Sequence, residues 1–314
     1  MKKNKIKFIG NILTLASVCY LIHFFRTLEI DFGLLLDCRM LFVILAGSLL
    51  SFFIVLLSAL AWKNTIVFFS EKKVSFHAAA VVYLQANLGK YLPGNIAHFV
   101  ERSIFAAKFG IGQAQTLMGT FLEITGLLFT SVALGMVFSF DDVCRIIRLI
   151  CSVKYVIGIV LLGFAGMLGL WFLYQKMLWM HSFFEKIRMA GFWKLFFGNV
   201  CIYMTTLLLL ACLMCVLTGI ITEKWLTPEQ IRGIVNAYVL SWAAGFLMPG
   251  APGGIGVREF VLIYLTRNQS IQESVLLAMI VHRITTVFGD VWGYVWAKVT
   301  ERKEESDECE VSNR

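Results

Sequence analysis

Charged side chains are scarce in this sequence. Only 15% of its 314 residues are Asp, Glu, Lys or Arg, whereas 59% are apolar. A soluble globular chain has about 25% charged and about 45–50% apolar residues. So few charges cannot cover the surface of a soluble domain of this size, which excludes a soluble enzyme, a disordered chain and a fibre. An integral membrane protein remains.

Proline is scarce as well, with four residues against 27 phenylalanines. This balance favours long lipid-facing helices over the turn-rich strands of an outer-membrane barrel. We therefore predict an all-α, polytopic transmembrane helix bundle. The net charge of +8 is explained by basic residues that gather in cytoplasmic loops, so we expect no nucleic-acid partner.

Several catalytic signatures are missing. The sequence has no Walker phosphate loop, HExxH pair, Gly-x-Ser-x-Gly elbow or spaced Asp cluster, so nothing indicates an ATPase or a classical hydrolase. Cys212 and Cys215 have CxxC spacing but sit among leucines without a second ligand pair, and we interpret them as packing residues. We expect neither a metal site nor a cofactor.

Six apolar runs are long enough to cross a bilayer, which takes about 20 residues. They cover approximately 8–25, 40–62, 116–138, 155–174, 195–219 and 275–299. With the N-terminus in the cytoplasm, the inner segments hold 17 Lys and Arg and the outer segments hold 8. This bias predicts a multi-pass protein of the cell (inner) membrane with both termini in the cytoplasm. Residues 301–314 are expected to form a polar cytoplasmic tail.

Two further apolar stretches, 76–107 and 235–265, are interrupted by glycine and proline. The interruptions are Gly89, Pro93 and Gly94 in the first stretch and Gly245, Pro249, Gly250, Pro252, Gly253, Gly254 and Gly256 in the second. Backbone freed by such a break is tolerated at membrane depth only where protein or a water-filled cavity satisfies it. We predict two re-entrant helical hairpins, each entering and leaving on one side.

The two breaks share the pattern Gly-x-x-x-Pro-Gly. A tyrosine precedes each proline by ten or eleven residues (Tyr83 and Tyr238), and an adjacent acid and base follow. Three spans separate the patterns, so the second hairpin must enter from the opposite face. We predict a single membrane domain over 1–300 made of inverted repeats, about 1–138 and about 154–300. In such transporters, paired interrupted helices mark a site at the midplane.

Ionisable groups in apolar runs are costly and are functional candidates by default. The candidate binding residues, with one asparagine beside the first break, are Lys90, Asn95, Glu101, Arg102, Glu123, Arg258, Glu259, Arg283 and Asp290. Half-helix N-termini after the breaks would add positive partial charge, so the expected guest is an anion, most simply a lipid phosphate. A structural alternative is that Arg258 pairs with Glu101 or Glu259.

The long helices carry candidates of their own. Glu123 has no neutralising residue at helical spacing on its own span, so it is a protonated packing residue, a proton-coupling group or the partner of an intramembrane arginine. Arg283 and Asp290 are seven residues apart and lie nearly on one helical face, which predicts a polar stripe toward the interior. His98 and His282 are interpreted as packing residues rather than titrating ones. Asn87 is interpreted as a cap for backbone groups freed by the first break.

The segments Leu88-Gly-Lys-Tyr-Leu-Pro-Gly-Asn-Ile-Ala-His-Phe-Val-Glu-Arg102, Lys108-Phe-Gly-Ile111 and Pro249-Gly-Ala-Pro-Gly-Gly-Ile-Gly-Val-Arg-Glu259 resemble the membrane region of the lysylphosphatidylglycerol synthases and their stand-alone flippase-like relatives. The resemblance implies inverted repeats with re-entrant hairpins, and movement of a lipid between leaflets. The synthases also carry a cytoplasmic aminoacyl-transferase domain. Residues 1–314 contain no such segment, so aminoacylation by this chain is not expected.

Together these patterns predict a lipid translocase that moves an anionic or lipid-linked head group between leaflets in cell-envelope lipid or polysaccharide synthesis. It would be a transporter and not an enzyme, and its partners would be a phosphate-bearing membrane lipid and envelope-synthesis enzymes. Two alternatives stay open. One is a membrane-embedded head-group transferase with Glu123 or Glu259 as base, and the other is a non-catalytic membrane partner of an envelope-synthesis enzyme.

Overall fold

The computed structural model describes residues 37–70, 73–92, 97–150, 185–247, 252–267 and 270–312. Within these ranges the chain is helical and contains no strand, as expected for an all-α bundle. The elements are α3 (Cys38–Ser70), α4 (Phe76–Asn87), η1 (Leu88–Tyr91), α5 (Ala97–Lys108), α6 (Gln113–Phe138), α7 (Phe140–Ile150), α10 (Ala190–Thr222), α11 (Pro228–Leu247), η2 (Pro252–Gly254), α12 (Val257–Thr266) and α13 (Gln272–Ser312).

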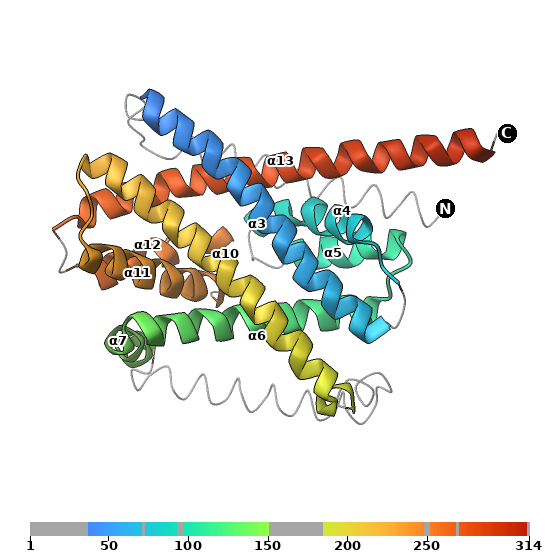
Figure 1. The fold of residues 1–314 in the computed structure, drawn as a ribbon, viewed down its shortest axis with the longest axis horizontal. Coiled ribbons are helices and arrows are strands. Elements are labelled where there is room, and N and C mark those ends of the chain that lie inside the picture. Colours follow the sequence, from blue (N-terminus) through green and yellow to red (C-terminus); the bar gives the residue numbers. More distant parts are fainter. Residues whose placement is uncertain are drawn as a thin grey trace.

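Four of the described helices are long and apolar enough to span a membrane: Cys38–Ser70, Gln113–Phe138, Ala190–Thr222 and Gln272–Glu301. They contain four of the six predicted spans. The other two, 8–25 and 155–174, lie outside the described residues. Helix α13 continues to Ser312, well past the predicted end of the last span, and it extends beyond the rest of the bundle in Figure 1.

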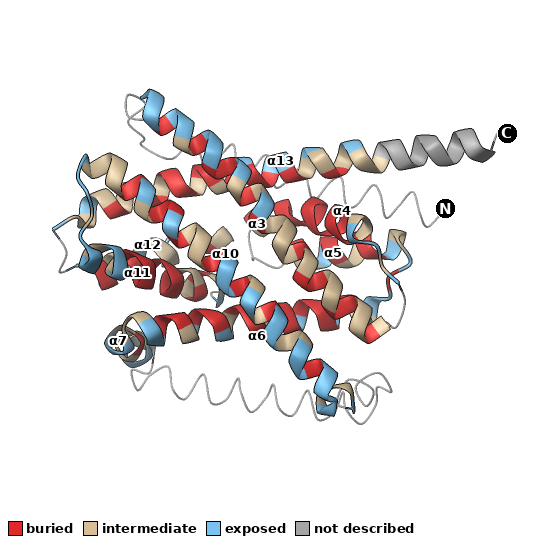
Figure 2. Cartoon of the chain, viewed as in Figure 1, coloured by how far each residue is buried: buried red, intermediate tan, exposed pale blue. Residues whose placement is uncertain are grey.

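The outer faces of the long helices are apolar. Exposed side chains on α3 recur at helical spacing: Leu41, Phe42, Leu45, Leu49 and Phe53. The same exposure continues along α10, which lies beside α3 in Figure 2. Water-soluble monomers rarely expose apolar patches of this extent, so these faces indicate a membrane-embedded protein.

Local sequence signals determine where the shorter helices begin. Ser75 caps α4, where its hydroxyl accepts a hydrogen bond from the N–H of Ala78 at 3.1 Å. Helix α11 starts at Pro228, a residue favoured at the first helical position because it has no N–H to leave unpaired. Thr227 and Gln230 close a capping box around it, with each side chain accepting from the other's backbone N–H.

Helices α3, α4, α5 and α6 make contacts that correspond, in this order, to the contacts of α10, α11, α12 and α13. Helix α3 packs on α4 as α10 packs on α11, and α4 packs on α13 as α11 packs on α6. Helices α4 and α5 contact each other, as do α11 and α12, and η1 touches η2. In Figure 1 the pair α4–α5 lies at the right end of the bundle and the pair α11–α12 at the left end.

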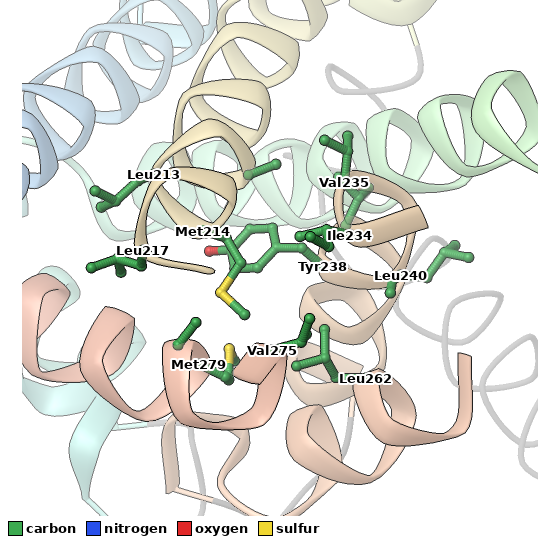
Figure 3. Packing of buried hydrophobic residues seen from close by; sticks show 14 of the residues in the cluster. Leu213, Met214, Leu217, Ile234, Val235, Tyr238, Leu240, Leu262, Val275 and Met279 are labelled. Atoms are coloured by element: carbon green, nitrogen blue, oxygen red, sulfur yellow. The ribbon is translucent and has the colours of Figure 1, made fainter. Parts of the chain in front are cut away.

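Two main hydrophobic clusters hold the bundle. The larger is built chiefly from α10, α11, α12 and α13, and Figure 3 shows its side chains converging around Tyr238 from α11. The second joins α3, α4 and α5 to Ala297 of α13 around Trp62. Each α4–α5 or α11–α12 pair is therefore anchored in its own apolar cluster.

Candidate functional site

A cavity of about 180 Å³ lies where the two pairs of short helices approach each other. One water needs roughly 10–15 Å³ by the same measure, so the space is large enough for a small polar group. Every helix named above except α7 contributes to its wall. Its cationic side chains are Lys90, Arg102, Arg258 and Arg283. Phe99, Trp242 and Phe246 form an aromatic part of the wall.

Glu123 of α6 is buried and engaged on both oxygens. The guanidinium of Arg102 from α5 forms an ion pair with Oε2, and the Tyr83 hydroxyl from α4 donates to Oε1 at 2.5 Å. The Tyr83 ring also lies 4.0 Å from the Arg102 guanidinium carbon. Of the roles considered for Glu123, the geometry matches the partner of an intramembrane arginine. Arg102 is 1% exposed.

Asp290 of α13 holds the first break in place. Its carboxylate accepts from Asn87 Nδ2 at 2.6 Å and from the Tyr91 hydroxyl at 2.5 Å, and Lys90 Nζ lies 2.7 Å from Oδ2. The Asn87 amide therefore binds a carboxylate and does not cap η1, where it makes no side-chain cap. Lys90 keeps 29% of its side chain exposed, while Asp290 keeps 2%.

Glu259 and Arg283 form the corresponding pair at the second break. Arg283 Nε lies 2.6 Å from Glu259 Oε1, and Arg283 Nη2 donates to the Gly254 carbonyl at 3.2 Å. The other Glu259 oxygen accepts from the N–H of Gly256 at 2.7 Å. Glu259 thus occupies the N-terminal end of α12, which was expected to face the guest. Gly253, Gly254 and Gly256 all have positive φ, a backbone conformation that glycine adopts without steric cost.

Arg258 differs from the other cations of the cavity wall. It forms no ion pair with any carboxylate of the described residues, whereas Lys90, Arg102 and Arg283 each form one. It packs against Gly245 and Gly254, where an added Cβ would lie 2.9 and 2.8 Å from its Nε. Its guanidinium carbon lies 5.7 Å from the Trp242 ring centroid, a cation–π contact. The structural alternative, in which Arg258 pairs with Glu101 or Glu259, is not observed among the described residues.

Glu101 lies behind the first break. It is completely buried, and neither carboxyl oxygen has a hydrogen-bond partner among the residues described. His98, one turn earlier on α5, lines the cavity and has an unpartnered Nδ1. His282 makes the contacts of a packing residue, with Nε2 3.2 Å from the Leu210 carbonyl oxygen and its ring 5.0 Å from Tyr238.

The predicted residues divide into three groups. Lys90, Arg102, Glu123, Arg258 and Arg283 line the cavity, together with Gly253 from the second break. Glu259 and Asp290 do not line the cavity but form ion pairs with residues that do. Glu101 packs against Gly89, and Gly245 and Gly254 pack against Arg258. The predicted residues outside the described ranges are Pro93, Gly94, Asn95, Pro249 and Gly250.

No role in the site was assigned from the sequence to its aromatic residues. Tyr91 donates to Asp290, and Trp242 lies under Arg258. Tyr83 and Tyr238 were noticed only as part of the repeated pattern, yet both line the cavity. The signal was available, since Tyr91 adjoins Lys90 in the first break and Trp242 lies three residues before Gly245 in the stretch leading to the second.

Comparisons of the chain with protein-family models, with curated proteins and with solved structures find no match.

Proposed function

We propose that this chain is a lipid translocase that moves an anionic or lipid-linked head group between the leaflets of the cell membrane, as part of cell-envelope lipid or polysaccharide synthesis. The observation that carries the proposal is Arg258, a cation on the cavity wall without a carboxylate partner among the described residues. The cavity cations Lys90, Arg102 and Arg283 already have such partners. A guest with one negative charge would complete the pairing.

Lys90 supplies a second contact in this proposal. Asp290 is bound by Tyr91 and Asn87 as well as by Lys90, so it keeps two donors when Lys90 turns toward an anion. The Lys90 side chain is also the more accessible member of its pair. Charge-assisted hydrogen bonds from both residues fit a phosphate, and the acyl chains of its lipid can remain in the bilayer.

The architecture we propose has six spans and two re-entrant hairpins, α4–α5 and α11–α12, in inverted repeats with both termini in the cytoplasm. The correspondence between the helix contacts supports it, as does the position of the two pairs at opposite ends of the bundle in Figure 1. In each half the second hairpin helix forms an ion pair with the next long helix, Arg102 with Glu123 and Glu259 with Arg283. Transport would follow from rocking of one repeat against the other. We place the chain with the flippase-like relatives of the lysylphosphatidylglycerol synthase membrane region.

The experiment uses purified protein in phosphatidylcholine vesicles that contain phosphatidylglycerol with a fluorescent group on one acyl chain. A membrane-impermeant reductant destroys the fluorescence in the outer leaflet, so the rate of further loss measures movement from the inner leaflet. We compare wild type with Arg258→Gln and with the double variant Arg258→Gln/Lys90→Gln. Arg267→Gln is the matched control, because Arg267 is an exposed arginine at the end of the same helix.

Loss of a charge-assisted hydrogen bond costs about 1.5–3 kcal/mol, so Arg258→Gln should slow movement about tenfold or more and Arg267→Gln should not. Labelled phosphatidylcholine, whose head group has no net charge, should move more slowly than phosphatidylglycerol. Equal rates for wild type and the double variant would overturn the proposal. Mass spectrometry of the same vesicles tests the transferase alternative, which requires a chemically altered head group.

A further inference from the structure

The buried carboxyl of Glu101 is unlike the other buried acids of the site. Glu123 and Asp290 are each bound by two or more donors, and a cation is among the donors in both cases. Glu101 is equally buried but has no partner on either oxygen within the described part of the chain. The residues that the structure describes therefore do not balance a negative charge at Glu101.

Burying an unpaired carboxylate costs far more free energy than burying the neutral acid, so a carboxyl group without a cationic partner binds a proton instead. The ionisable residues of α5 and of the elements packed against it are His77, Tyr83, Lys90, Tyr91, His98, Arg102, Lys108 and Glu123. None of them forms an ion pair with Glu101. Arg102 is bound to Glu123, and Lys90 to Asp290. Within the described part of the chain, only proton binding remains to neutralise Glu101.

The position of Glu101 connects it to the moving part of the proposed transporter. A Cβ added to Gly89 would lie 2.8 Å from Glu101 Oε2 and 2.8 Å from the His98 backbone nitrogen. The carboxyl thus lies directly against the backbone of η1, the segment that carries Lys90 and touches η2. A negative charge appearing at Glu101 would act on this backbone and on the contact between the two breaks.

His98 provides a route for the proton. It is three residues before Glu101 on the same face of α5, it lines the cavity, and its Nδ1 is without a partner. A proton arriving in the cavity can bind the imidazole and pass to the carboxylate, either directly or through water. No electron or other group is transferred in this step.

We infer that Glu101 is the proton-binding residue that couples lipid movement to a difference in pH across the membrane. The inference rests on the proposed translocation. Glu101 is neutral while η1 is packed against it, and it releases its proton when the α4–α5 pair moves and exposes the carboxyl. One proton is then bound and released in each cycle. The direction in which the proton crosses the membrane favours one direction of lipid movement.

The experiment repeats the vesicle assay with the same labelled phosphatidylglycerol, at symmetric pH and with an imposed pH difference. For wild type we expect the difference to change the rate by up to about tenfold per pH unit, the bias available from one proton per cycle. Glu101→Gln replaces the carboxyl with an amide of the same shape that cannot bind or release a proton, so the rate of this variant should be the same with and without the pH difference. Glu101→Asp should retain a response, and Asp141→Asn, which removes an exposed carboxylate from α7, should match wild type.

Two results would overturn the inference while leaving the translocase intact: wild type that moves lipid at a rate independent of the pH difference, or a full response in Glu101→Gln. Wild type that moves no lipid would refute the proposed function instead. Infrared spectroscopy then tests Glu101 by itself. We expect the carbonyl band of a protonated carboxylic acid in wild type and in Asp141→Asn, and its loss in Glu101→Gln. A wild-type spectrum that does not change on Glu101→Gln would contradict proton binding at this residue.

Discussion

Replacing Arg102 by methionine should destabilise the protein strongly, and changing Glu123 to glutamine at the same time should recover most of the loss. The Arg102 and Glu123 side chains are 1% and 6% exposed. Removing one partner of a buried ion pair typically costs about 3–5 kcal/mol, because the remaining charge is left without compensation. In Arg102→Met, Glu123 keeps only the Tyr83 hydroxyl at 2.5 Å.

The double variant Arg102→Met/Glu123→Gln buries no charge. The amide oxygen at position 123 can still accept from Tyr83, so the residual cost is about 1 kcal/mol, the size of one altered hydrogen bond. The double variant should therefore be more stable than Arg102→Met by at least about 2 kcal/mol, which is close to thirtyfold in the ratio of folded to unfolded protein. The second substitution would therefore stabilise the protein that already carries Arg102→Met.

Unfolding by sodium dodecyl sulfate in mixed micelles, followed by tryptophan fluorescence, measures these differences. Arg145→Met is the control. Arg145 pairs with Asp142 at 2.9 Å on α7, where its side chain is 39% exposed, and such a surface pair contributes about 0–1 kcal/mol. A double variant as unstable as Arg102→Met, or more so, would show that Glu123 does not depend on Arg102 for neutralisation.

Two further predictions concern topology and packing. With Cys144 as the only cysteine, an impermeant thiol reagent should label intact cells from outside, whereas Cys309 alone should react only after permeabilisation; cytoplasmic labelling of Cys144 would contradict the inverted repeat. Gly89→Ala should reduce both stability and lipid movement, because the added Cβ would lie 2.8 Å from the His98 backbone nitrogen. Gly198→Ala on α10 has open space around the added Cβ and should be neutral or raise stability by about 0.5–1 kcal/mol, so equal effects of the two substitutions would refute the packing argument.

Hydrophobicity and backbone chemistry predicted much of the fold. The run 116–138 lies within Gln113–Phe138, and the run 40–62 lies within Cys38–Ser70, because about 20 consecutive apolar residues have few alternatives to a spanning helix. The second break was recognised from its glycines, three of which adopt the positive φ that only glycine accommodates easily. These signals are local and can be recognised in a short stretch of sequence.

The pairing of charges could not be predicted in the same way. Sequence reasoning considered Arg258 with Glu101 or Glu259, since these residues are close along the chain or in corresponding positions. Glu259 binds Arg283 instead, and Arg258 and Glu101 do not form an ion pair with each other. Which cation reaches which carboxylate depends on how helices cross, and a sequence pattern gives the helical face but not the crossing partner.

The charge pairs also differ in how far apart their members lie in the chain, which bears on how the protein enters the bilayer. Arg102 and Glu123 are on consecutive helices, as are Glu259 and Arg283, so each of these ion pairs can form as soon as its second helix has been inserted. The partner of Lys90 is Asp290, which is on α13 and is therefore synthesised much later. During synthesis, Lys90 and the neighbouring hydroxyl of Tyr91 therefore stay without their final partner until α13 arrives. Insertion of α13 is the step that completes the polar centre, and a chain that stalls before it would keep an uncompensated lysine for quality control to detect.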